Sequence, residues 1–182
     1  MRREWKWAAV LFRLRKRSSV ALGLLAMLLA MSSLSCERDD LCAPGEALTP
    51  RIRITFQNVD SPTILKNVPN LEVRATTDTG TEVILQDANA SDILLPLPVQ
   101  GSEITLQFVR DTDDTTTTEN ADDVIMTFQL EQQYINRACG FRVLYNNLNA
   151  IAPGDTDSWI QNIIIVEDDV TNEEDIHVQI QH

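Results

Sequence analysis

The chain has few of the residues from which catalytic and metal sites are usually built. Its 182 residues include only two histidines and three cysteines. It contains no CxxC or HExxH motif, so it lacks the usual zinc ligand patterns. It also lacks a GxSxG motif and a glycine-rich phosphate loop. These absences favour a protein that is not an enzyme and that has no cofactor and no metal site.

Histidine is too scarce to support a Ser/His/Asp arrangement easily, because such an arrangement needs a positioned imidazole as base. The only internal candidate is His177, which lies in an alternating apolar and polar segment on the face opposite Ile176 and Val178. In a strand of this pattern one face is buried and the other is solvated. We therefore expect His177 to face solvent.

Positive charge is scarce outside the N-terminal segment. The net charge is −12, yet residues 1–35 carry seven basic residues and one acidic residue, so the rest of the chain carries −18. A surface this acidic repels phosphate backbones, which argues against nucleic acid as a partner. The simplest interpretation is a well-hydrated surface. The alternative is a surface that attracts or binds cations.

No apolar run is long enough to span a bilayer as a helix, which takes about 20 residues. The longest run is Val20–Met31, and basic residues up to Arg17 precede it. A basic flank followed by a short apolar core is typical of a secretory signal. Because basic flanks stay cytoplasmic, the chain after residue 31 is expected to be translocated.

The segment Ser32–Cys36 resembles a bacterial lipoprotein lipobox. That resemblance implies cleavage before Cys36 and lipid attachment to its thiol, with residues 1–35 removed. Ser33 stands where leucine is usual, and Leu34 follows it. The alternative is an ordinary secretory signal with a chance cysteine. Several acyl chains hold a protein durably on membrane lipid, so we expect an outer-membrane protein, on the periplasmic face or the cell surface.

Two cysteines remain if Cys36 is lipidated, namely Cys42 and Cys139. In an oxidising compartment a leftover pair tends to form a disulfide. A loop of about 100 residues closed in this way contributes about 4–5 kcal/mol in the chain-entropy model. The alternative is two separate buried thiols.

The mature chain divides into a tether and one β-rich domain. Residues 36–50 are polar and contain the breakers Pro44, Gly45 and Pro50. Residues 51–182 contain about nine short apolar or alternating segments, which favour an all-β fold, an immunoglobulin-like β-sandwich. Residues 159–166 are apolar on both faces and predict a central strand, with Trp159 in the core. The segments are 52–56, 71–75, 81–85, 93–95, 104–108, 124–130, 141–145, 159–166 and 176–180.

The longest polar segment, residues 111–123, is expected to join two strands of a hairpin. Its oxygens from Asp111 to Asp122 are spaced nearly as in a calcium loop, but Thr116 replaces the required glycine and an aspartate ends the pattern. A solvated acidic turn is the simpler interpretation, as it is for 167–169 and 173–175. Asp114-Thr115-Thr116 resembles a bacterial O-glycosylation motif, which would place sugar on Thr115.

Three stretches together resemble an uncharacterised family of small lipoproteins from Bacteroidota-type bacteria. They are 36–42 (CERDDLC) with Thr49-Pro50, 137–140 (RACG), and Trp159-Ile160 with 173–178. The resemblance implies a β-rich fold and a bond between Cys42 and Cys139, and it implies no activity. Acidic residues after Cys36 are similar to surface-export signals of such lipoproteins, although a solvated linker has the same composition.

These observations lead to one functional hypothesis and two alternatives. The main hypothesis is a non-enzymatic, lipid-anchored module of the cell envelope that binds or assists an envelope protein or glycan. The first alternative is a glycan hydrolase, which would need two facing carboxylates in a cleft. The second is a calcium-stabilised adhesive domain, whose melting temperature would rise with calcium.

Overall fold

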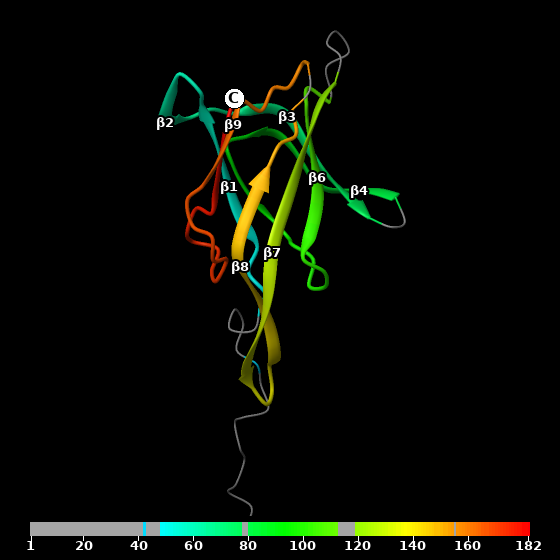
Figure 1. Ribbon diagram of the computed structural model, residues 1–182, viewed down its shortest axis with the longest axis vertical. Coiled ribbons are helices and arrows are strands. Elements are labelled where there is room, and N and C mark those ends of the chain that lie inside the picture. Colours follow the sequence, from blue (N-terminus) through cyan, green and yellow to red (C-terminus); the bar gives the residue numbers. More distant parts are fainter. Residues whose placement is uncertain (1–41, 43–47, 78–79, 113–118, 155) are drawn as a thin grey trace, which may run out of the picture. The chain divides into compact units, whose positions relative to one another are not determined.

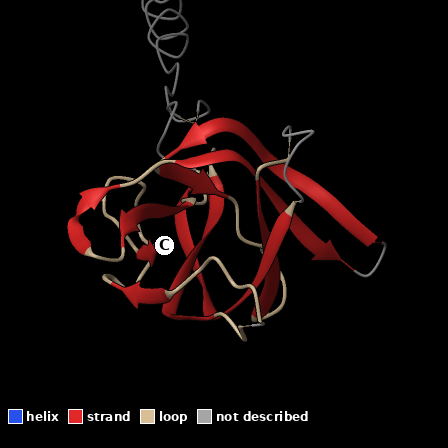
Figure 2. Cartoon of the chain, turned by 90° about the horizontal axis from the view of Figure 1, so that it is seen from above, coloured by secondary structure: helices blue, strands red, loops and turns tan. Residues whose placement is uncertain are grey.

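The protein is an all-β sandwich of two sheets (Figure 1). The computed structural model describes residues 42, 48–77, 80–112, 119–154 and 156–182. Within these residues every regular element is a strand (Figure 2), and there are ten strands. The described part of the chain contains no helix long and apolar enough to cross a membrane. The expected fold class is confirmed, with one strand more than the sequence indicated.

The first sheet is built around β1 (Ile52–Asn58). On one side β1 pairs in parallel with β10 (Val178–Gln181), which pairs with β9 (Asn162–Ile165) at the edge. On the other side β1 pairs with β5 (Asp92–Leu95) along its first half and with β2 (Ser61–Leu65) at its end. The strand nearest the N-terminal tether is therefore a central strand of its sheet.

The second sheet is entirely antiparallel. Its order is β4 (Gly80–Ala90), β3 (Val68–Thr77), β6 (Glu103–Arg110), β7 (Asn120–Asn136) and β8 (Gly140–Ile151). Hairpins join β3 to β4, β6 to β7 and β7 to β8. The hairpin predicted around residues 111–123 is thereby confirmed in its strand pairing.

The core lies between the sheets and follows the period-2 pattern of the strands. An aromatic cluster fills one end of it. Phe56 lies 6.2 Å from Phe108, 6.3 Å from Trp159 and 6.2 Å from His182, measured between ring centroids. Trp159 also donates its indole N–H to the carbonyl of Phe108 at 3.3 Å. Trp159 is a core residue, as expected, and its burial with its ring neighbours stabilises this end.

The prediction of a central strand over residues 159–166 is wrong. The strand is β9 alone, and it forms the edge of its sheet. Before it, Trp159 and Ile160 turn into the core without pairing as a strand. Ile163 and Ile165 pack against the core, whereas Ile164 is 36% exposed. Trp159, Ile160, Ile163 and Ile165 contact the core, whereas Val166 is 51% exposed, so the run is not enclosed by the sheet on both faces.

The prediction that His177 faces solvent is also wrong. Strand β10 begins only at Val178, and the imidazole of His177 is fully buried. Its backbone N–H donates to the carbonyl of Arg53, while its Nδ1 accepts the backbone N–H of Arg53 at 3.0 Å. The side chain thus replaces one ladder hydrogen bond beside β1. Burial lowers the pKa of His177 below the ordinary histidine value.

Candidate functional site at the disulfide-linked hairpin

The far end of the β7–β8 hairpin extends beyond the part of the sandwich that the facing sheet covers. In Figure 1 this end lies below the other labelled strands. Tyr134 and Phe141 pair directly across the hairpin, and their side chains are 57% and 64% exposed. Their rings meet edge to face, with centroids 5.2 Å apart. Two large aromatic side chains are therefore held together in solvent.

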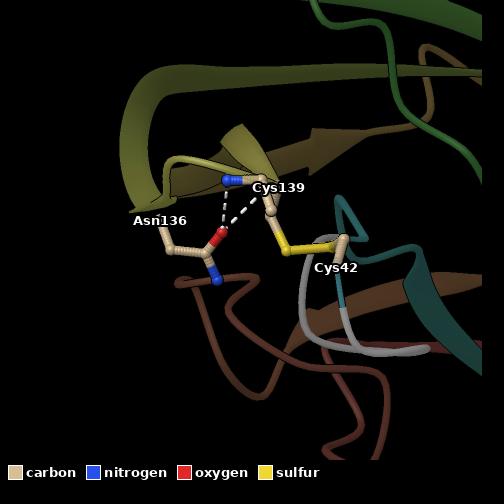
Figure 3. Close-up of a disulfide and its surroundings, with 4 residues drawn as sticks. Cys42, Asn136 and Cys139 are labelled. Carbon is tan, nitrogen blue, oxygen red and sulfur yellow. Dashed lines mark hydrogen bonds between the residues drawn. A yellow bond between two sulfur atoms is a disulfide. The ribbon is translucent and has the colours of Figure 1, made fainter. Parts of the chain in front are cut away.

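The turn at this end is fixed by one side chain and one glycine. Asn136 Oδ1 accepts the backbone N–H of Ala138 at 2.9 Å and that of Cys139 at 2.7 Å (Figure 3). Gly140 then adopts a φ of 73°, in the left-handed region that glycine enters without steric cost. The asparagine and the glycine give a rigid turn in which Cys139 has a defined direction.

A disulfide joins this turn to the segment before the domain. Cys42 and Cys139 are bonded, with their Cα atoms 4.9 Å apart and 97 positions apart in sequence (Figure 3). The predicted pairing of these cysteines is therefore found in the structure. A second attachment follows, because Val143 on β8 donates its backbone N–H to Thr49 Oγ1 at 3.1 Å. The entering chain is held against the hairpin at two places.

The hairpin end differs in charge from the rest of the domain. No aspartate or glutamate occurs from Gln132 to Gly154, and the two charged residues there are Arg137 and Arg142. Among the described residues, no carboxylate lies within ion-pair distance of either arginine, and Arg142 Nε instead donates to Gln133 Oε1 at 2.7 Å. The other described arginines all have acidic partners. This end is therefore the weakly basic part of an acidic chain.

One cavity lies at β9, and none of the described residues that line it is acidic. It measures about 610 Å³ and extends from Ala150 to Ser158 and Ile163. In a smaller cavity beside it, Asp122 Oδ2 accepts Ser158 Oγ–H and the backbone N–H of Ile160, each at 2.7 Å. Asp122 thus fixes the loop that leads Trp159 into the core. Its neighbour Asp123 also lines this cavity, where its Oδ1 accepts a hydrogen bond from Gln107 Nε2 at 3.2 Å.

A third cavity, of about 540 Å³, contains two carboxylates that are paired with arginines. Glu173 binds Arg51 and Asp92 binds Arg53, with closest distances of 2.9 and 2.6 Å. The hydrogen bonds from Arg51 lower the pKa of Glu173 to about 2. A glycosidase general acid needs a raised pKa. Glu173 is therefore suited to an ion pair and unsuited to that role.

Several residues singled out from the sequence are not brought together. Cys36 and Thr115 lie outside the described residues, as do residues 113–118 of the calcium-like loop. Asp122, the last oxygen donor of that loop, is buried and bonded to Ser158 and Ile160. The carboxylates of Glu167, Asp168 and Asp169 lie within 4.8 Å of one another but are exposed.

Sequence reasoning missed the exposed aromatic pair. Residues 141–145 alternate like a half-buried strand, and alternation alone does not show where the facing sheet ends. The signal that could have revealed the pair is its position, because Tyr134 and Phe141 flank the turn residues Asn136 and Gly140 closely. A hairpin so long that its turn lies far from the other strands exposes the side chains next to that turn.

Together, the fold and the hairpin define a disulfide-linked all-β sandwich domain. The chain belongs to the family of unknown function DUF6452, which matches residues 70–182. The match includes Cys139 and the 137–140 motif but begins after the tether. Comparison with curated proteins and with solved structures gave no match.

Proposed function

We propose that the protein is a non-enzymatic module of the outer membrane, attached through a lipid on Cys36. The observation that supports this most is the bond between Cys42 and Cys139. It ties the chain to a rigid turn six residues after Cys36, so that a lipid there would hold the domain by a defined end. A disulfide also fits an exported protein, since disulfides persist in oxidising compartments.

The role proposed for the tethered domain is binding or assistance to an envelope protein or glycan. The carboxylates in the described cavities make ion pairs or hydrogen bonds that stabilise the fold. The acidic body has eight basic and 26 acidic residues after residue 35, which favours partners with exposed cations over anionic polymers. Periplasmic and cell-surface placement are both compatible with this role.

The test is the intact mass of the protein purified from membranes, before and after thiol reduction. We expect a chain that begins at Cys36 and carries acyl groups, and that gains the mass of two hydrogens on reduction. The control is Cys36→Ser. This variant cannot be acylated at residue 36, so it should be released from the membrane. A wild-type chain without acyl groups would overturn the anchor.

A further inference from the structure

We propose that the β7–β8 hairpin end is a membrane-contacting surface, with Tyr134 and Phe141 in the lipid interface. This inference rests on the proposed lipid at Cys36 and extends it from the anchor to the domain itself. We call this end of the hairpin the hairpin tip: it comprises Arg137 in the turn, the Tyr134–Phe141 pair on one face, and Arg142 on the opposite face.

The first argument is the length of the tether. Cys42 lies six positions after Cys36, and a fully extended chain spans at most about 20 Å over six positions. The disulfide then places Cys139 beside Cys42, with 4.9 Å between their Cα atoms. The distance from a lipidated Cys36 to Cys139 therefore cannot exceed the extended length of the tether plus the separation of the two bonded cysteines. The hairpin tip, which contains Cys139, must stay close to Cys36. Parts of the domain that lie farther from Cys139 can lie correspondingly farther from Cys36.

The second argument is the chemistry of the exposed side chains. Aromatic residues are enriched where lipid headgroups meet the hydrocarbon, and tyrosine fits there because its ring is apolar and its hydroxyl is polar. Tyr134 and Phe141 are the described aromatic side chains that are more than half exposed. Leu48, also exposed, precedes Thr49, which binds the same hairpin through Val143.

The third argument is charge complementarity. An anionic membrane surface repels a domain with an acidic body but attracts basic residues that lie close to it. The stretch from Gln132 to Gly154 lacks acidic residues, and its two arginines have no acidic partner among the described residues. Within residues 51–182 the hairpin tip is thus the part that can approach anionic lipid with the least repulsion, and the nearby acidic residues Glu37, Asp39 and Asp40 belong to the tether.

The experiment uses the full lipoprotein reconstituted in vesicles of phosphatidylglycerol and phosphatidylcholine. Tyr134→Trp places a fluorophore on the hairpin tip, and Ile64→Trp places a matched one on β2. Ile64 is 58% exposed, close to the 57% of Tyr134, and β2 lies at the other end of the domain in Figure 1. Wild-type protein supplies the background of the buried Trp159. The measured quantity is the loss of emission when the phosphatidylcholine has brominated acyl chains.

We expect Tyr134→Trp emission to shift to the blue and to be quenched by the brominated chains, while Ile64→Trp emission stays unchanged. Equal, unquenched emission from both variants of an acylated chain would overturn the hairpin-tip inference and leave the anchor standing. A blue shift without quenching would assign the hairpin tip to a protein contact instead. A chain whose mass lacks acyl groups would overturn the anchor, and with it the membrane placement of the hairpin tip.

Discussion

The aromatic cluster around Phe56 and the hairpin tip show two ways of ordering aromatic residues. In the cluster, Phe56, Phe108 and Trp159 are buried between the two sheets, and burial itself stabilises them. At the hairpin tip, Tyr134 and Phe141 contact each other but no second sheet covers them. Order there comes from a disulfide and a capped turn. Removing a buried side chain should therefore disturb the sandwich body more than removing the disulfide does. At the hairpin tip, removing the disulfide should have the larger effect.

The largest difference between the two regions is expected when a phenylalanine is replaced by alanine in each of them. Phe108→Ala removes a fully buried ring and should lower the free energy of unfolding by about 3–5 kcal/mol. Phe141→Ala removes a ring that is 64% exposed and should change it by less than about 0.5 kcal/mol. Urea unfolding followed by Trp159 fluorescence measures both. Similar losses would mean that Phe141 is packed as tightly as Phe108.

Removing the crosslink should affect the hairpin tip more than the sandwich body. The double variant Cys42→Ala with Cys139→Ala should be less stable by about 2–4 kcal/mol, because the unfolded chain regains the freedom of a long loop. Hydrogen exchange should show that the amides of Ala138 and Cys139 open before those of β6. Reduction of wild type should reproduce the loss and should leave the double variant unchanged. An unaltered urea midpoint would contradict the assigned role of the bond.

A smaller effect is expected at the loop that leads Trp159 into the core. Asp122→Ala leaves the N–H of Ile160 and the hydroxyl of Ser158 without their acceptor, which should cost about 1–3 kcal/mol. Asp123→Ala is the matched control, since Asp123 is the exposed neighbour on β7 and should cost less than about 0.5 kcal/mol. Thermal unfolding monitored by circular dichroism compares them. If the two variants lost equal stability, Asp122 would not be needed to position this loop.

The smallest effect concerns pH and the sandwich body. Burial lowers the pKa of His177 and of His182 below 6.5, so below that pH the unfolded chain binds protons that the folded chain does not. Stability should therefore fall as pH drops from about 6.5 towards 5, by about 1.4 kcal/mol for each unit by which a pKa is lowered. His177→Asn keeps an acceptor for the N–H of Arg53 and removes the titration. Urea midpoints across this range should fall less steeply in the variant, and an unchanged slope would contradict the assignment.

The sequence predicted those parts of the fold that depend on local alternation. Strand β1 and the β3–β4 and β6–β7 hairpins follow the period-2 pattern, because a sheet with one buried face imposes it. Strand β2 was not predicted, since it is exposed and contains Pro62, which is tolerated at an edge. The parallel pairing of β1 with β10 has no local signature, because the two strands are far apart in the chain.

The candidate site was predictable only in its covalent part. Cysteine arithmetic and the resemblance both pointed to Cys42 and Cys139, and the structure joins them. The surroundings were not predictable, because exposure depends on where the opposite sheet stops. The burial of His177 was not predictable either. Its side chain is buried where it accepts a hydrogen bond from the backbone of Arg53, a contact that the alternating pattern does not reveal.

The parallel pairing of β1 with β10 also determines when the first sheet can form during synthesis. Ile54 lies opposite Val178, so a central strand made early acquires its inner neighbour only when residues 178–181 have become available. Until then β1 can reach only the short strands β5 and β2. Contacts across so much sequence form slowly, since the intervening loop must close first. The first sheet is therefore completed only after all of the second sheet, from β3 to β8, has been synthesised.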